Sequence, residues 1–187
     1  MSTEAMDTAD QEQAWVRAAQ QGDAAAFRCL VDCYDRRVLY FVLRFLPDSH
    51  QALDVMQEVW LALFRRLPHL RAPGAFRVWL YQIAHDQVVT LLRRQRRQER
   101  LQARLAEHVG DGTLTNHELD FDRAELVHKA LDVLSLEHRE VLVLRFLEGM
   151  SLDEIAEALR CRPGTVKSRL HYAKRDLRQE VERLSHD

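Results

Sequence analysis

The apolar residues of this chain recur every three or four positions over most of its length, and this spacing constrains the fold more than any other feature. Between residues 27 and 45 the intervals are 3, 1, 3, 4, 3, 1 and 3, which place the apolar side chains on one helical face. Only 6 glycines and 4 prolines occur among 187 residues, so the chain has few of the turns that sandwiches and barrels require. Spacing and composition together predict an all-α fold.

The helical pattern divides into two small domains. In the first, long helices end at Pro47 and Pro68, because proline disrupts a helix interior, and another begins at Pro73. The period is lost after residue 100, where turn-forming and acidic residues predict a flexible linker, and it returns near residue 123. The predicted organisation is a disordered tail at 1–13, a helical bundle at 14–100, a linker at 101–122 and a second helical domain at 123–187.

The second domain contains the signals of a helix-turn-helix. Ser151 and Glu154 have the spacing of a capping box, and they begin a short helix. Pro163 begins the next helix, whose polar face is basic. Such a helix offers Lys, Arg, Ser and Thr side chains to the major groove of DNA, although a basic surface helix within a bundle is the alternative.

The net charge of −2 hides two basic blocks. Residues 63–104 contain 10 basic and 2 acidic side chains, and residues 160–178 contain 7 and 1. Blocks of this kind predict contacts with a polyanion, or else solvated helix faces. The acidic residues between Glu107 and Glu125 are expected to lie over the basic blocks when DNA is absent.

Several functional classes find no support in the sequence. No run of about 18 apolar residues occurs, and the first residues do not resemble a signal peptide, so we expect a cytoplasmic protein without membrane insertion. Catalytic and nucleotide-binding motifs are missing, so we expect neither an enzyme nor a cofactor. Cys29, Cys33 and Cys161 leave a redox or metal sensor open, although a role as small buried hydrophobic residues explains the first two better.

Two sets of motifs resemble a known family. Residues 54–60 read DVMQEVW and residues 76–84 read FRVWLYQIA, which are similar to regions 2.2 and 2.3 of bacterial sigma factors. Residues 139–173 contain REVL, LRFLEG, SLDEIA and PGTVKSRLHYA, which resemble region 4. The short linker between the two sets is typical of the extracytoplasmic-function (ECF) group of sigma-70 factors.

The resemblance implies a partner and a mechanism. The chain would bind the β′ and β subunits of core RNA polymerase, recognise promoter −10 DNA with region 2 and −35 DNA with region 4, and be held inactive by an anti-sigma factor. A helix-turn-helix regulator that binds duplex DNA alone, and senses a ligand in its first domain, is the alternative.

The resemblance also implies site residues. The polymerase-binding residues would be Asp54, Gln57, Glu58 and Leu61, opposite the β′ coiled coil. The −10 residues would be Arg77, Tyr81, His85, Asp86, Arg93, Arg94, Arg96 and Arg97, with the loop from Pro68 to Gly74 helping to receive a flipped base. The −35 residues would be Arg162, Thr165, Lys167, Ser168, Arg169, His171 and Arg175.

Two departures from the family pattern affect these expectations. His85 and Asp86 stand where Arg-Asn is common; Asp86 would repel phosphate but accept a hydrogen bond from cytosine N4. Arg162 stands where a capping residue is expected, and its side chain would reach phosphate instead. Arg169 has an alternative role, which is to face the acidic side of its own domain.

Overall fold

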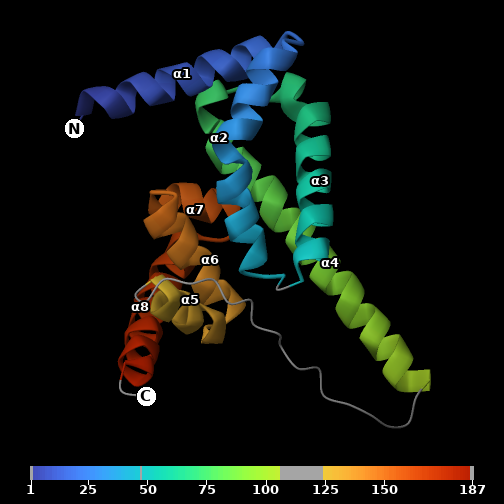
Figure 1. Cartoon of the computed structure of the whole chain (residues 1–187), viewed down its shortest axis with the longest axis vertical. Helices are drawn as coiled ribbons and strands as arrows, with labels where there is room; N and C mark the ends of the chain where they lie inside the picture. The colour runs from blue at the N-terminus through green and yellow to red at the C-terminus, as the bar shows by residue number, and fades with distance from the viewer. Residues whose placement is uncertain (1, 47, 106–123, 186–187) are drawn as a thin grey trace. The chain divides into compact units, whose positions relative to one another are not determined.

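The computed structural model of the chain describes residues 2–46, 48–105 and 124–185. These residues form eight α-helices with short 3₁₀ and π-helical turns, and they contain no β-strand (Figure 1). They divide into two compact units, which we call unit 1, up to Leu105, and unit 2, from Ala124. The expected all-α fold with two helical domains is confirmed.

Helix α1 (Ser2–Gln20) occupies the segment where we expected a disordered tail up to residue 13. Its described side chains pack on unit 1, because Val16 is fully buried and Tyr34 donates a hydrogen bond from its hydroxyl to the Glu12 carboxylate. The structure therefore differs from the expected tail over residues 10–13. Contacts with distant residues, rather than an apolar repeat of its own, hold this part of the helix.

Helices α2 (Ala24–Leu43), α3 (Ser49–Arg66) and α4 (Phe76–Leu105) complete unit 1. The carboxylate of Asp23 accepts hydrogen bonds from the first free N–H groups of α2, and Asp48 does the same for α3. Pro47, the expected end of the first long helix, lies outside the described residues, and α2 ends before it. Because α4 extends to Leu105, the start of the expected linker is helical; the remainder, including its acidic residues, is not described.

The core of unit 1 is rich in aromatic side chains. Phe41 packs edge-on against Tyr81, with 5.4 Å between ring centroids, and Tyr34 lies 5.7 Å from Phe76. Edge-to-face pairs of this kind add to the free energy gained from burial alone. These contacts fix α2 and α4 together along one side of α4.

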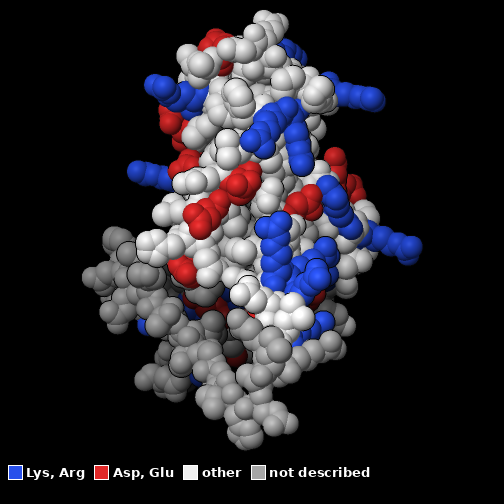
Figure 2. Space-filling view, turned by 90° about the vertical axis from the view of Figure 1, so that its right-hand side faces the viewer, with Lys and Arg blue, Asp and Glu red and all other residues white. Residues whose placement is uncertain are grey.

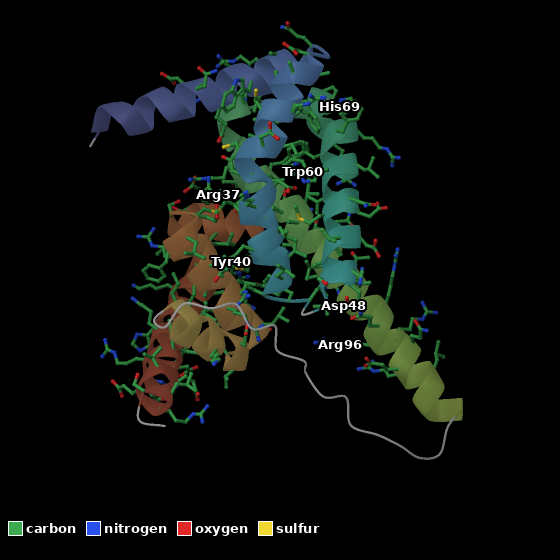
Figure 3. All side chains as sticks on the ribbon, viewed as in Figure 1. Arg37, Tyr40, Asp48, Trp60, His69 and Arg96 are labelled. Atoms are coloured by element: carbon green, nitrogen blue, oxygen red, sulfur yellow. The ribbon has the colours of Figure 1, made fainter. Side chains whose placement is uncertain are left out.

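A loop joins α3 to α4 and contains two short 3₁₀ turns, Leu67–His69 and Pro73–Ala75. Leu67 is buried, while the exposed side chains of His69 and Arg71 stand on the outer side of the loop. In Figure 3, His69 lies near the end of α3 and the last turn of α1. The loop thus has an anchored base and an exposed edge.

Unit 2 is a five-element helical domain. Its elements, in order, are α5 (Ala124–Val133), α6 (Leu136–Leu142), the π-helical turn η3 (Val143–Leu147), α7 (Leu152–Ala158) and α8 (Pro163–Leu184). The predicted capping box is confirmed: Ser151 Oγ accepts from Glu154 N at 3.2 Å, and Glu154 Oε2 accepts from Ser151 N at 2.7 Å. The short α7, a tight turn and the long α8 form the helix-turn-helix.

Two turn residues in unit 2 have left-handed backbones. Gly149, before α7, has a φ of +65°, which glycine adopts at little cost. Arg160, between α7 and α8, has a φ of +50° although it carries a Cβ. The turn of the helix-turn-helix is therefore strained at one residue.

The π-helical turn η3 leaves two apolar side chains at the surface. Phe146 is 62% exposed and Leu147 is 55% exposed, whereas Val143 and Leu144 in the same turn are buried. Arg145 Nη1 donates a hydrogen bond of 2.7 Å to the carbonyl of Met150 and links the turn to the start of α7.

In the part of the chain that the structure describes, no helix combines the length and apolar character needed to cross a membrane.

Candidate polymerase and nucleic-acid interfaces

Helix α3 places the four expected polymerase-binding residues on one exposed stripe. Asp54, Gln57, Glu58 and Leu61 are all exposed and are spaced 3, 1 and 3 apart. The opposite face of α3 is buried through Ala52, Val55, Met56, Val59 and Leu63. The structure thus brings the four residues together, and their role in binding stays a prediction.

An apolar groove of about 630 Å³ runs beside this stripe, between α2 and α3. Leu53 and Phe64 lie in it with 51% and 62% of their surface exposed, while Trp60 is half-buried. The indole of Trp60 donates a 3.0 Å hydrogen bond to Asp35, and Phe27 packs edge-on against Phe64 at 5.3 Å. The groove therefore has an ordered wall and an exposed apolar rim.

Leu53 and Phe64 were not among the site residues predicted from the sequence. The signal was present, because α3 carries more apolar residues than one buried face accommodates: Leu53, Trp60, Leu61 and Phe64 form a second stripe at helical spacing. Exposed apolar stripes on a surface helix indicate a protein partner. Asp54 and Glu58 lie on the same exposed side of α3, which therefore combines apolar side chains with carboxylates.

The residues expected to contact −10 DNA are divided between the core and the surface of α4. Tyr81 has no exposed surface and packs on Phe41, so its place on a polar base-receiving face is corrected. Arg77, His85 and Asp86 are half-buried, and the His85 ring nitrogen lies 4.0 Å from the Asp86 carboxylate. Of the residues expected to contact −10 DNA, only those in the second half of α4 are exposed.

That half of α4 forms a basic segment. Arg93, Arg94, Arg96 and Arg97 are all exposed, and Figure 3 shows Arg96 on the lower part of this helix. Gln95 donates a 2.7 Å hydrogen bond to Gln51 at the start of α3, which fixes the orientation of the segment within unit 1. In the face shown in Figure 2, basic side chains project from the surface with acidic side chains among them.

Helix α8 exposes most of the residues expected to contact −35 DNA. Arg162, Lys167, Ser168, His171 and Arg175 are exposed, and Thr165 is half-buried. Arg162 is the N-cap residue and makes no capping hydrogen bond, in agreement with the expectation that arginine does not cap this helix. Ser168 donates its hydroxyl to the Thr165 carbonyl at 3.0 Å, which holds that side chain against the helix.

Arg169 and Arg175 have partners within unit 2. The Arg169 guanidinium lies 3.9 Å from Glu137 of α6, so the alternative expectation, that Arg169 faces the acidic side of its own domain, describes its position. Arg175 contacts Asp176 at 3.0 Å, and Asp176 also lies 3.1 Å from the ring of His138. These contacts orient the middle of α8 on α6, and they leave the first turns as the freer basic surface.

Residues 30–98 match the family model for sigma-70 region 2, and residues 124–177 match the model for sigma-70 region 4. The RNA polymerase sigma-H factor of Pseudomonas aeruginosa is 35% identical over 96% of this chain and 98% of that protein. The chain belongs to the ECF group of sigma-70 factors.

Other relatives agree with this family. The ECF RNA polymerase sigma-E factor of Escherichia coli is 32% identical, over 92% of this chain and 95% of that protein. A structure of CnrH in complex with the cytosolic domain of CnrY has a TM-score of 0.65 at 24% identity, covering 92% of this chain and 97% of that one. A Bartonella quintana sigma factor, RpoE, solved with the anti-sigma factor NepR, has a TM-score of 0.67 at 20% identity, covering 83% and 96%. The two solved structures support the fold.

The three cysteines of this sigma factor are divided between the two units. Cys29 is half-buried and Cys33 is exposed on α2, while Cys161 lies half-buried in the turn before α8. Burial raises the pKa of the Cys161 thiol, and Glu140 adds to the increase, although Arg169 partly opposes it. A raised thiol pKa lowers the fraction of reactive thiolate, which argues against a sensing role for Cys161. No group of three or more potential metal ligands occurs among the described residues.

Proposed function

We propose that this sigma factor binds core RNA polymerase through α3, directs it to promoters through unit 2, and opens the −10 DNA with unit 1. The exposed acidic and apolar side of α3 is the observation that carries the proposal, because a free DNA-binding regulator has no need of it. The factor acts in the cytoplasm, without catalytic activity of its own.

The polymerase contact combines charge and apolar burial. Asp54 and Glu58 would meet a basic surface on the β′ coiled coil, and Leu61 would be buried between the two proteins. The groove beside them supplies Phe64 and Leu53 as further apolar anchors, the kind of residue that dominates binding energy at interfaces. Like charges held one helical turn apart cost a few tenths of a kcal/mol in the free helix, and this cost is recovered only against a basic partner.

The −10 contact joins the loop between α3 and α4 to the basic segment of α4. Arg93, Arg94, Arg96 and Arg97 would neutralise phosphates, while the exposed edge of the loop would hold a base that has left the stack. Asp86 would accept a hydrogen bond from cytosine N4. Because Tyr81 is in the core, it supports this surface from inside and does not stack on the base.

The −35 contact uses the first turns of α8. Lys167 and Ser168 are exposed on the part of α8 where a recognition helix would meet base edges, and the exposed Arg162 would contact phosphate. Arg169 positions α8 on α6 instead of reading bases.

Inhibition by an anti-sigma factor completes the proposal. The Bartonella quintana RpoE was solved with the anti-sigma factor NepR, and CnrH was solved with the cytosolic domain of CnrY, which supports a protein partner of this kind here. An anti-sigma factor that covers the α3 groove would prevent polymerase binding, because one apolar surface cannot serve two partners at once.

Run-off transcription with purified core polymerase and a promoter library tests the proposal. The wild-type chain is expected to give promoter-specific products, and Glu58→Lys is expected to abolish most of them by repelling the basic partner. Asp10→Lys is the matched control, because it makes the same charge change at an exposed site on α1. Specific products no greater than those of core alone would reject the proposal, and tight duplex binding without polymerase would favour the regulator.

A further inference from the structure

The loop between α3 and α4 is held by a residue from α1. The side-chain amide nitrogen of Gln20 donates to two main-chain carbonyls of the loop, that of Leu67 at 3.1 Å and that of Leu70 at 2.7 Å. An amide nitrogen carries two hydrogens, so one side chain satisfies both acceptors. These carbonyls flank the first 3₁₀ turn, which otherwise closes through the hydrogen bond from Leu70 N to Leu67 O.

Helix α1 also contacts the far end of the loop. A Cβ placed on Gly74 would lie 3.6 Å from the side-chain nitrogen of Gln13, so helix and loop are in van der Waals proximity there. Gln13 and Gln20 are seven residues apart, which is two helical turns along the same face of α1. One helix face therefore supports both ends of the loop.

This support leaves the outer edge of the loop exposed. Leu67 is buried and Leu70 half-buried, while His69 and Arg71 are exposed on either side of Leu70. Fixing the two leucine carbonyls restricts the backbone between them, and it thereby limits where the His69 side chain can point. A loop that selects one base benefits from such restriction. If its contacts are misplaced or mobile, the protein still binds DNA but distinguishes less well between the four bases.

We propose that Gln20 is a positioning residue for base selection at the −10 element: by fixing the Leu67 and Leu70 carbonyls, it sets the shape of the loop that accepts the flipped base. The proposal rests on the proposed function, because it presumes that this loop meets −10 DNA. Gln20 itself makes no base contact, so its effect is on discrimination between bases more than on polymerase binding.

The test compares initiation on four promoters that differ only in the flipped non-template base, using the full chain with core polymerase. Gln20→Met removes both donors at similar volume, and Gln20→Glu places a carboxylate against two carbonyl oxygens. Each variant is expected to reduce the ratio of initiation rates on the best and the worst promoter about tenfold, because each lost hydrogen bond contributes a factor of several. Affinity for core polymerase, measured by fluorescence competition, is expected to stay within twofold of wild type.

Two controls separate positioning from general destabilisation. Gln21→Glu makes the same charge change at the neighbouring exposed residue and is expected to keep the wild-type ratio. Val88→Ala weakens the core of unit 1 and is expected to lower thermal stability while it preserves the ratio. If both Gln20 variants kept the wild-type ratio between the best and the worst promoter, the proposal for Gln20 would be overturned. The same would follow if Val88→Ala lowered that ratio as much as the Gln20 variants do. Neither result would bear on the proposed function. A wild-type chain without specific initiation would overturn the proposed function as well.

Discussion

Helices α3 and α8 each have an exposed face that we assign to a partner, and the two faces differ in composition. Helix α3 buries one apolar stripe and exposes another, with carboxylates beside it, whereas α8 buries Val166, Leu170 and Ala173 and exposes mainly basic and polar groups. A surface of apolar groups and carboxylates matches a protein partner, and a basic polar surface matches a phosphate backbone. The difference supports our proposal that the two faces bind different partners.

The largest expected effect is on polymerase binding through α3. Replacing Phe64 by aspartate removes an exposed apolar anchor and adds a charge where the partner would bury it, so we expect a loss of about 2–4 kcal/mol in binding free energy. Fluorescence competition for core polymerase measures this loss. Leu101→Asp, at an exposed leucine on the last part of α4, is the control. If Phe64→Asp and Leu101→Asp bound core polymerase with equal affinity, the apolar face of α3 would have no special role in polymerase binding. The contrast drawn between α3 and α8 would then fail.

A smaller effect is expected for DNA recognition through α8. Lys167→Ala removes an exposed cation from the first turns, and we expect a loss of about 1–3 kcal/mol against the preferred −35 sequence. Holoenzyme binding to a −35 duplex, measured over a range of salt concentrations, tests this. Arg178→Ala, on the second half of the same helix, should have little effect; if it matched Lys167→Ala, the contact would be nonspecific.

The turn before α8 should be stabilised by glycine. Arg160 has a φ of +50°, and Arg160→Gly is expected to stabilise unit 2 by about 1 kcal/mol, because glycine has no Cβ to clash in this conformation. Hydrogen exchange of the α7 and α8 amides measures the change. Arg162→Gly, at a residue with a φ of −79°, should bring no such gain. Slower exchange in both variants would mean that charge, not backbone strain, is responsible.

The smallest effect concerns the attachment of α1 in unit 1. Burial and the bond to Glu12 raise the pKa of Tyr34 well above its usual range. The folded state therefore keeps a proton that the unfolded state loses above about pH 10, so stability falls as pH rises past that value. Tyr34→Phe should cost about 1 kcal/mol at neutral pH and flatten this decline.

Tryptophan fluorescence during denaturation at several alkaline pH values measures the Tyr34 effect. All three tryptophans, Trp15, Trp60 and Trp79, lie in unit 1, so the signal does not report on unit 2. A decline above pH 10 that is equally steep in Tyr34→Phe would assign it to other groups.

The sequence predicted what depends on local pattern. Helical spacing predicted the all-α fold, the family resemblance pointed to the four residues that share an exposed stripe on α3, and the Ser151–Glu154 spacing predicted the capping box. It did not predict the position of Tyr81, because α4 packs against both α2 and α3 and its buried face is wider than one apolar stripe. Nor did it predict helix α1 over residues 10–13, where the contact of Glu12 with Tyr34 comes from a residue 22 positions away.

The π-helical turn η3 has a consequence for how this domain can vary in length. A π-helical turn holds about one residue more than the α-helical turn it replaces. Removing one residue from Val143–Leu147 would convert the turn to ordinary helix, and the residues that follow would keep their direction because only the extra residue is lost. Helix α7 has only 7 residues between a capping box and a strained turn, and it contains no extra residue that could be lost in this way. We therefore expect unit 2 to tolerate the loss of one codon at this turn, which precedes its helix-turn-helix.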